Sequence, residues 1–219
     1  MESGARFLLH HFSVYHKDMK NYLILIAALL LSFSIQAQDI TLLNRVKSTN
    51  GAIKSFDADL NNTLVKPKKT TSQSGKLYFV KPNEFAALFT TGKCMVVNQT
   101  KIKMNIGLFH GTFKLKDGGT MQSLSRIFLY GFQGRIEDLA NENDYSVTTK
   151  TEGGLYHITA TDNKKHVIGI GYKTIIFKYH TDSLLLKEIV LYDYSGNKDI
   201  YTVSNVKYNV PVDSKTFQF

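Results

Sequence analysis

The chain has 219 residues, with 27 Lys and Arg against 18 Asp and Glu, a formal net charge of +9, and a single cysteine. One cysteine excludes an internal disulfide, so the burial of apolar side chains has to stabilise the fold. Basic residues are scattered apart from Lys66-Pro-Lys-Lys69, without an arginine-rich stripe or an aromatic stacking motif, so we expect no nucleic-acid binding.

Residues 19–37 have the pattern of a secretory signal peptide. Lys20 precedes an uncharged run from Tyr22 to Ile35, and Gln36-Ala-Gln38 supplies a small-residue cleavage site. The apolar run is too short to span a bilayer comfortably, which favours cleavage after Ala37 over a permanent anchor. A start at Met19 would make residues 1–18 an over-called extension. Residues 38–219 then form one exported domain, which we expect to be a soluble protein of an envelope compartment.

The domain opens with a predicted helix and continues with strands. Asp39 is a suitable helix cap, Leu42 and Val46 lie at helical spacing, and Ser48-Thr-Asn-Gly51 is expected to stop the helix. Residues 63–74 combine a proline with lysines and hydroxyl side chains, which we interpret as a solvated connection. Apolar and polar residues alternate with a period of two in predicted strands over residues 56–61, 75–80, 85–89, 94–98 and 102–109.

A second helix is predicted near the middle of the chain. Met121, Leu124, Ile127 and Phe128 recur at intervals of three and four, which gives one apolar stripe. The stripe either covers one end of a sheet or lines an apolar pocket. A weaker helical turn is predicted over residues 136–141.

The remaining segments return to strand alternation. Predicted strands cover residues 145–150, 155–161, 166–170, 172–179, 185–194 and 200–210. Tyr194-Ser-Gly-Asn-Lys198 has the composition of a tight turn, and Pro211 should end the sheet. Ten or eleven antiparallel strands in one domain curl into a barrel or half-barrel. The expected fold is therefore α+β, an incomplete antiparallel β-barrel lidded by two or three short helices.

The sequence contains no recognisable catalytic or metal-binding pattern. His110, His157, His166 and His180 lack metal-ligand spacing, and Cys94 has no base nearby in the sequence. We therefore expect no catalytic residue, metal or cofactor, and a hydrolase using one of these histidines is the weakest hypothesis. Apolar residues in excess of what one sheet face needs predict a cavity for an apolar ligand. A fully packed core is the alternative.

Four segments carry a resemblance to a known family. Ser55-Phe-Asp-Ala-Asp-Leu-Asn-Asn62 is similar to its Ser-Phe-x-Ala-x-Phe-x-Gln strand, and Gly75-Lys-Leu-Tyr-Phe-Val-Lys-Pro-Asn-Glu-Phe85 to its Gly-x-Leu-Trp-Val-Lys-Arg-Pro-Asn-x-Phe. Thr91-Gly-Lys-Cys-Met-Val-Val97 stands where the family has Asp-Gly-x-x-Leu-Trp, and Asn209-Val-Pro-Val-Asp213 matches its ending. In order and spacing these segments resemble the LolA family of periplasmic lipoprotein carriers.

The resemblance implies an incomplete barrel whose cavity takes the acyl chains of a lipoprotein. It also implies a monomer that receives acylated lipoproteins from an inner-membrane lipoprotein-releasing ABC transporter and passes them to an outer-membrane acceptor. Lys81 stands where the family has an arginine that holds the lid, so we expect Lys81 to act as the lid latch without the planar fork of donors. The residues expected to line the lipid-binding cavity are Leu60, Leu77, Phe79, Phe85, Met95, Met121, Leu124 and Phe128.

Two other hypotheses belong to neighbouring classes of protein. One is an envelope interaction or accessory module that docks a sheet face on an assembly partner. The other is a carrier of a different lipid or glycolipid. A lipid that co-purifies with the protein would separate the carriers from the module.

Overall fold

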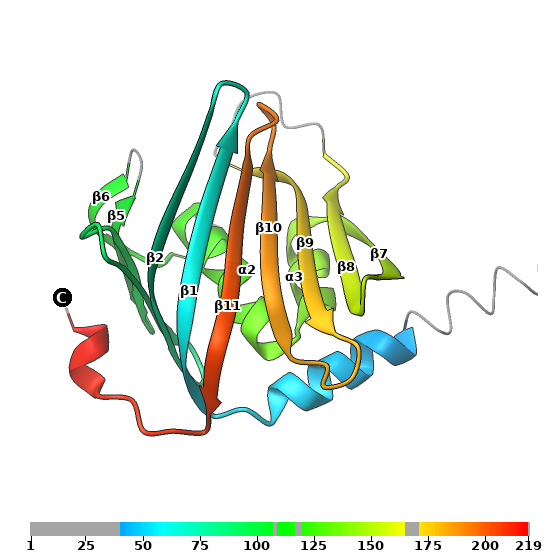
Figure 1. The fold of residues 1–219 in the computed structure, drawn as a ribbon, viewed down its shortest axis with the longest axis horizontal. Coiled ribbons are helices and arrows are strands. Elements are labelled where there is room, and N and C mark those ends of the chain that lie inside the picture. Colours follow the sequence, from blue (N-terminus) through cyan, green and yellow to red (C-terminus); the bar gives the residue numbers. More distant parts are fainter. Residues whose placement is uncertain (1–39, 107–108, 117–119, 165–170, 219) are drawn as a thin grey trace, which may run out of the picture. The chain divides into compact units, whose positions relative to one another are not determined.

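In the part of the chain that the computed structural model describes, eleven antiparallel strands form one open sheet (Figure 1). The described residues are 40–106, 109–116, 120–164 and 171–218. The chain divides into two units, residues 1–42 and 43–219, and the whole sheet belongs to the second. The predicted signal peptide and the extension before it lie outside the described residues.

The strand order places the first and the last strand of the chain side by side. The strands are β1 Ser55–Lys66, β2 Lys69–Val80, β3 Glu84–Phe89, β4 Cys94–Asn98, β5 Lys101–Ile106, β6 Phe109–Lys114, β7 Tyr145–Glu152, β8 Leu155–Asp162, β9 Tyr172–His180, β10 Leu186–Asp193 and β11 Lys198–Tyr208. Their order across the sheet is β6-β5-β4-β3-β2-β1-β11-β10-β9-β8-β7, so β6 and β7 are unpaired edges. The predicted incomplete antiparallel β-barrel is thereby confirmed.

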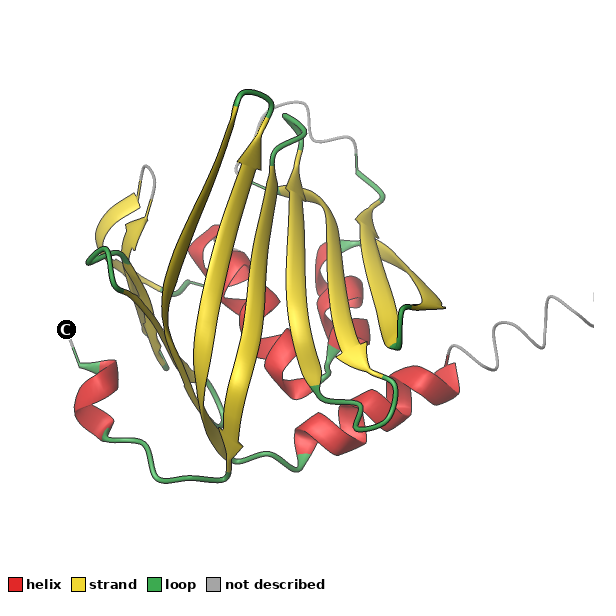
Figure 2. Cartoon of the chain, in the orientation of Figure 1, coloured by secondary structure: helices red, strands yellow, loops and turns green. Residues whose placement is uncertain are grey.

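The helices cover one face of this sheet (Figure 2). Helix α2 spans Thr120–Gln133 and contacts β10, while helix α3 spans Ile136–Asn143 and contacts β7 and β8. Residues 40–51 are also helical. The Tyr130 hydroxyl donates to Glu142 over 2.8 Å, and Arg126 pairs with the same carboxylate at 2.9 Å, so α2 and α3 form one connected layer. We call the sheet face under this layer the inner face.

Alternation along each strand sends apolar side chains to the inner face. On β1, Phe56, Ala58 and Leu60 are buried, and the residues between them are more exposed. The ring of Phe56 lies 5.2 Å from that of Phe79 and 5.3 Å from that of Phe132 on α2, measured between centroids. The core therefore lies between the sheet and α2.

The prediction of a solvated connection over residues 63–74 is wrong. Strand β1 continues to Lys66, β2 begins at Lys69, and the two pair along their whole length. Threonine and valine favour extended backbone, and this end of the hairpin is exposed, so polar residues occupy strand positions here. The polarity of this segment reflects exposure to water and not a loop.

The helix ends at residue 51, the last residue of the predicted stop Ser48–Gly51. Asn50 is buried, and its side-chain amide donates to the carbonyl oxygens of Val46 over 2.9 Å and of Leu184 over 2.8 Å. A tertiary contact thus retains a helical conformation that local sequence disfavours.

Two further predictions concern strands. The single strand predicted over residues 102–109 is divided between β5 and β6, which pair as a hairpin. The predicted strand over residues 166–170 lies outside the described residues.

The helical turn predicted over residues 136–141 is confirmed as α3, and the stripe from Met121 to Phe128 is confirmed as part of α2.

The outer face of the sheet carries a small apolar cluster near the end of the chain. The short helix η1, Ser214–Phe217, is capped by Asp213, whose side chain accepts from the Lys215 amide over 2.9 Å. Phe217 packs there against Ala86 and Val96.

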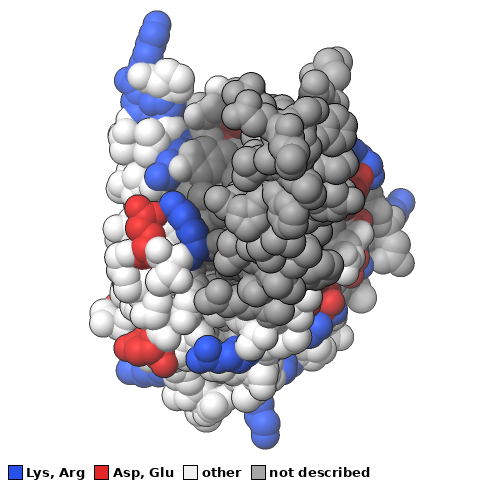
Figure 3. Space-filling view, turned by 90° about the vertical axis from the view of Figure 1, so that its right-hand side faces the viewer, with Lys and Arg blue, Asp and Glu red and all other residues white. Residues whose placement is uncertain are grey.

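On the described surface seen in Figure 3, basic and acidic side chains are interspersed and do not gather into patches of one sign.

Candidate functional site

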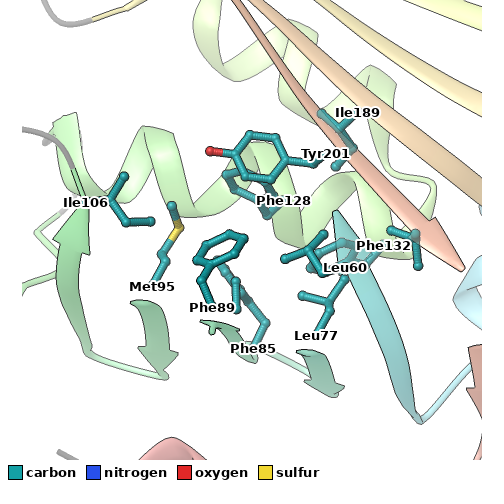
Figure 4. Close-up of a pocket in the computed structure, with 12 residues that line it drawn as sticks. Leu60, Leu77, Phe85, Phe89, Met95, Ile106, Phe128, Phe132, Ile189 and Tyr201 are labelled. Atoms are coloured by element: carbon teal, nitrogen blue, oxygen red, sulfur yellow. The ribbon is translucent and has the colours of Figure 1, made fainter. Parts of the chain in front are cut away.

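The inner face of the sheet and helix α2 enclose an apolar cavity (Figure 4). Side chains from both halves of the sheet and from α2 form its wall, and none of them is charged. The lining residues are Leu60, Leu77, Phe85, Ala87, Phe89, Met95, Ile106, Phe128, Phe132, Ile189, Tyr201 and Val203. Such a wall offers dispersion contacts and removal from water, which suit a hydrocarbon ligand.

Strand pairing brings these residues together from distant parts of the sequence. Phe85, Ala87 and Phe89 alternate along β3, so a period of two places all three on the inner face. Leu60 pairs with Val203 across the junction of β1 and β11, which joins the two halves of the wall.

Aromatic rings of α2 form the cover of the cavity. The ring of Phe128 lies 5.0 Å from that of Tyr201 at an angle of 85° and 5.6 Å from that of Phe85. Phe132, one helical turn later, lies 5.7 Å from Phe85. Edge-to-face rings at these distances attract one another, so α2 is held on the sheet by the same side chains that a ligand would contact.

The cavity is nearly closed in this conformation. The space open to the centre of a water molecule is about 10 Å³, roughly what one water needs. A ligand larger than one water could enter only if the rings of α2 moved away from the sheet.

A second small cavity borders Phe132. Phe132 and Val203 line both cavities. The rest of its wall is Asn50, Ile53, Phe56, Leu186, Val206 and Tyr208.

Several of the predicted lining residues meet at the cavity, namely Leu60, Leu77, Phe85, Met95 and Phe128. Phe79 does not line it and packs instead between Phe56 and Phe132. Met121 and Leu124 lie half-buried in the first part of α2, outside the wall.

The prediction missed seven lining residues: Ala87, Phe89, Ile106, Phe132, Ile189, Tyr201 and Val203. Ala87 and Phe89 share strand parity with Phe85, and Phe132 follows Phe128 by one helical turn, so periodicity held a signal for them. Ile189, Tyr201 and Val203 come from the far half of the chain. Only the pairing of β1 with β11 brings that half to the cavity.

The predicted latch, Lys81, lies in the turn between β2 and β3. Its ammonium group donates to the carbonyl oxygen of Gly51, at the end of the helix over residues 40–51, and its main-chain amide donates to Lys54 O over 2.9 Å. The buried side chain of Gln133 donates to the next carbonyl, Pro82 O, over 2.8 Å. This turn is therefore bonded to the ends of two helices.

One carboxyl group lies at the inner face beside the cavity. The Tyr201 hydroxyl donates to Asp199 over 2.9 Å, and the Asn62 amide donates to the other Asp199 oxygen. Burial raises the pKa of Asp199 above its ordinary value, against the opposing effect of these hydrogen bonds. Burial and the neighbouring Asp199 also raise the pKa of the Tyr201 phenol, which stays protonated at neutral pH.

Among the described residues, no group of three or more His, Cys, Asp or Glu side chains could hold a metal ion. The Nδ1 atom of His157 lies 3.9 Å from Oε2 of Glu152. Burial lowers the pKa of the His157 imidazole. His166 lies outside the described residues. No helix in the described ranges is both long and apolar enough to cross a bilayer.

Residues 51–219 match the family model described as outer membrane lipoprotein carrier protein LolA. Comparison with curated proteins gave no match. Solved structures similar to this chain include a DUF1329 family protein from Desulfovibrio piger ATCC 29098, with 13% identity and a TM-score of 0.46, covering 84% of this chain and 97% of that one.

Two other solved structures resemble this chain with a comparably low sequence identity and TM-score. A LolA superfamily protein from Nitrosomonas europaea has 9% identity and a TM-score of 0.41, covering 82% of this chain and 96% of its own. An uncharacterized conserved protein from Thermus thermophilus has 10% identity and a TM-score of 0.47, covering 84% of this chain and 94% of its own. Likenesses this distant carry no argument about function.

Proposed function

The chain belongs to the LolA family of outer membrane lipoprotein carrier proteins, and we propose that it carries the acyl chains of lipoproteins in the cavity under α2. The observation that carries this proposal is the uncharged wall of that cavity, built from the sheet and α2 together. In this proposal the protein works in the periplasm, between an inner-membrane lipoprotein-releasing ABC transporter and an outer-membrane acceptor.

The energy of binding comes from the removal of hydrocarbon from water. Each acyl methylene that is buried contributes about 0.8 kcal/mol. Part of this gain offsets the separation of Phe128 from Tyr201 and Phe85, because these rings are in contact across the cavity. A carrier benefits from this balance, since an opening cost limits affinity and permits release to the next partner.

Handover in this proposal needs no covalent chemistry. The protein would bind the acyl chains in an open state and release them to an acceptor that offers a lower free energy. The direction of transport is then set by the relative affinities of transporter, carrier and acceptor. The carrier itself is not expected to act as an enzyme.

The experiment is uptake of a fluorescently labelled acyl peptide by the purified protein, together with native mass spectrometry for co-purified lipid. Ala87→Leu fills part of the cavity and should lower uptake, because Ala87 lines the wall. Ala52→Leu, the same change at an exposed site, is the matched control. Absence of both bound lipid and peptide uptake, or equal uptake by the two variants, would contradict the carrier proposal.

A further inference from the structure

We infer that the inner face has a separate polar subsite, at Asn62, Gln73 and Asp199, which binds a neutral head group carrying hydrogen-bond donors while the hydrocarbon part occupies the apolar cavity. This inference rests on the proposed function, because it requires that the cavity take an amphiphile. The ligand class is an acyl glycerol or acyl amide, whose hydroxyl or N–H groups can donate.

Polar side chains from three neighbouring strands lie next to one another on the inner face. On β1 the inward residues Phe56, Ala58 and Leu60 are followed by Asn62. Asn62 pairs directly with Gln73 on β2 and with Tyr201 on β11. Asp199 on β11 pairs with Leu64, one inward position beyond Asn62, and the hydrogen bond from Asn62 joins the two positions diagonally, beside the wall of the cavity. A surface divided in this way matches a molecule that has an apolar chain and a polar head.

Hydrogen bonds join these polar side chains into one network. The Thr91 hydroxyl donates to Gln73 over 2.9 Å, and the Gln73 amide donates to Asn62 over 3.0 Å. The Asn62 amide in turn donates to Asp199 and to Ile200 O. Four segments of chain therefore fix the orientation of these groups before any ligand arrives, which lowers the entropy that binding has to overcome.

Tyr201 connects the apolar and the polar parts. Its ring lines the cavity against Phe128, and its hydroxyl donates to Asp199. A chain that lies along this ring would bring its head group to the carboxyl. The subsite therefore begins where the hydrocarbon wall ends.

Asp199 keeps acceptor capacity for a ligand. A carboxylate has about four acceptor positions, and within the described residues Asp199 receives one bond from Asn62 and one from Tyr201. No Lys or Arg in those ranges forms an ion pair with it, and the ammonium of the adjacent Lys198 lies 5.7 Å from the centre of the Tyr192 ring. A carboxyl without a cation favours donors and repels anionic head groups such as phosphate.

The test compares two amphiphiles with the same lauroyl chain, monolauroylglycerol and methyl laurate, as competitors of an apolar fluorescent dye bound to the full chain. The glycerol ester has hydroxyl donors and the methyl ester has none. We expect the wild-type protein to prefer the glycerol ester by about tenfold, which corresponds to one or two net hydrogen bonds.

Asn62→Leu and Asp199→Asn should reduce this preference to about twofold or less, because each removes a polar partner of the head group. Asn61→Leu, at the exposed neighbour of Asn62 on the same strand, is the matched control and should keep the preference. Tyr201→Phe removes only the hydroxyl and should weaken the preference without altering the cavity wall.

The outcomes test the polar subsite and the carrier function separately. Equal affinity of the wild-type protein for both esters, or variants that weaken both esters alike, would overturn the polar subsite and leave the carrier function standing. Failure of both esters to displace the dye would overturn the carrier function itself. Circular dichroism and thermal unfolding of each variant confirm that the compared proteins are folded.

Discussion

The hydroxyl group of Tyr179, a fully buried residue of β9, donates a hydrogen bond to the main-chain carbonyl oxygen of Gly131 in α2 over 2.7 Å. The helix approaches the sheet closely at this point, because a Cβ on Gly131 would lie 2.8 Å from the Phe177 ring. Gln133 is bonded to Pro82 O at the same end of the helix. Helix α2 is therefore fixed to the sheet at its C-terminal end, and we expect the cavity to open from the other end.

Tyr179→Phe should lower the free energy of unfolding by about 1–2 kcal/mol, because it removes a buried hydrogen bond and leaves one carbonyl with fewer donors. Tyr156→Phe is the matched control, since Tyr156 lies directly opposite Tyr179 on β8 and its hydroxyl makes no hydrogen bond to a described residue. Urea unfolding followed by circular dichroism measures the difference. Equal loss in the two variants would contradict a specific role for the Tyr179 bond.

Two glycines allow the close contacts of α2, and alanine should not be tolerated at either. Gly134 has a φ of 68°. A Cβ atom at Gly134 would lie 2.6 Å from the main-chain carbonyl oxygen of Val46. We expect Gly131→Ala and Gly134→Ala each to cost about 1–3 kcal/mol, from overpacking and, at Gly134, also from the left-handed backbone. Gly51→Ala is the control, because nothing lies within 4 Å of a Cβ there. Thermal unfolding that ranks Gly51→Ala with the other two would argue against this interpretation.

Phe128→Trp provides a reporter of cavity opening, because the chain contains no tryptophan. In the closed state the indole should emit at short wavelength between Phe85 and Tyr201, and an acyl ligand should change its emission as α2 moves. Leu88→Trp, at an exposed position of β3, serves as the control and should not respond. An indole at position 128 that is insensitive to a ligand shown to bind by another method would mean that α2 does not move.

Lys81 should stabilise the end of the helix over residues 40–51 through its bond to Gly51 O. Cations and donors near a helix C-terminus contribute about 0.3–1 kcal/mol, so Lys81→Met should lose about that amount and Lys81→Arg should retain it. Lys54→Met removes an exposed lysine from the same region and is the comparison. Chemical denaturation of the three variants checks the prediction, and a Lys81→Met protein as stable as wild type would refute it.

Asp199 should give the protein a characteristic pH dependence. Burial raises its pKa in the folded state above the usual 3.8, so the folded protein holds this proton more tightly than the unfolded chain does. The resulting stability is present at low pH and is lost as pH rises from the unfolded pKa through the raised folded pKa. Asp199→Asn cannot titrate. We therefore expect the free energy of unfolding of wild type, relative to this variant, to decrease as the pH rises above 3.8 toward neutrality.

The measurement for Asp199 is urea unfolding of both proteins across that pH range. The nearest titratable partner, the Tyr201 phenol, has a raised pKa and does not change its charge in this interval. A difference that stays constant, or that grows with pH, would show that Asp199 has no raised pKa.

Local sequence was sufficient for the elements and the fold class. The period of two in segments such as Phe85–Phe89 and the helical stripe from Met121 to Phe128 are short-range patterns, and they identified strands and a helix correctly. The same reasoning failed at Thr63–Ser74, where polarity results from exposure of a long hairpin.

Tertiary structure decided which of the inward side chains form the site. The sequence placed Phe79 and Phe85 on the same face, but the packing of α2 leaves only Phe85 at the cavity and seals Phe79 between Phe56 and Phe132. Pairing of β1 with β11 added Tyr201 and Asp199, which lie far from Asn62 in the sequence. Periodicity records which way a side chain points, whereas the contacts across the sheet depend on register, and register is a property of the folded chain alone.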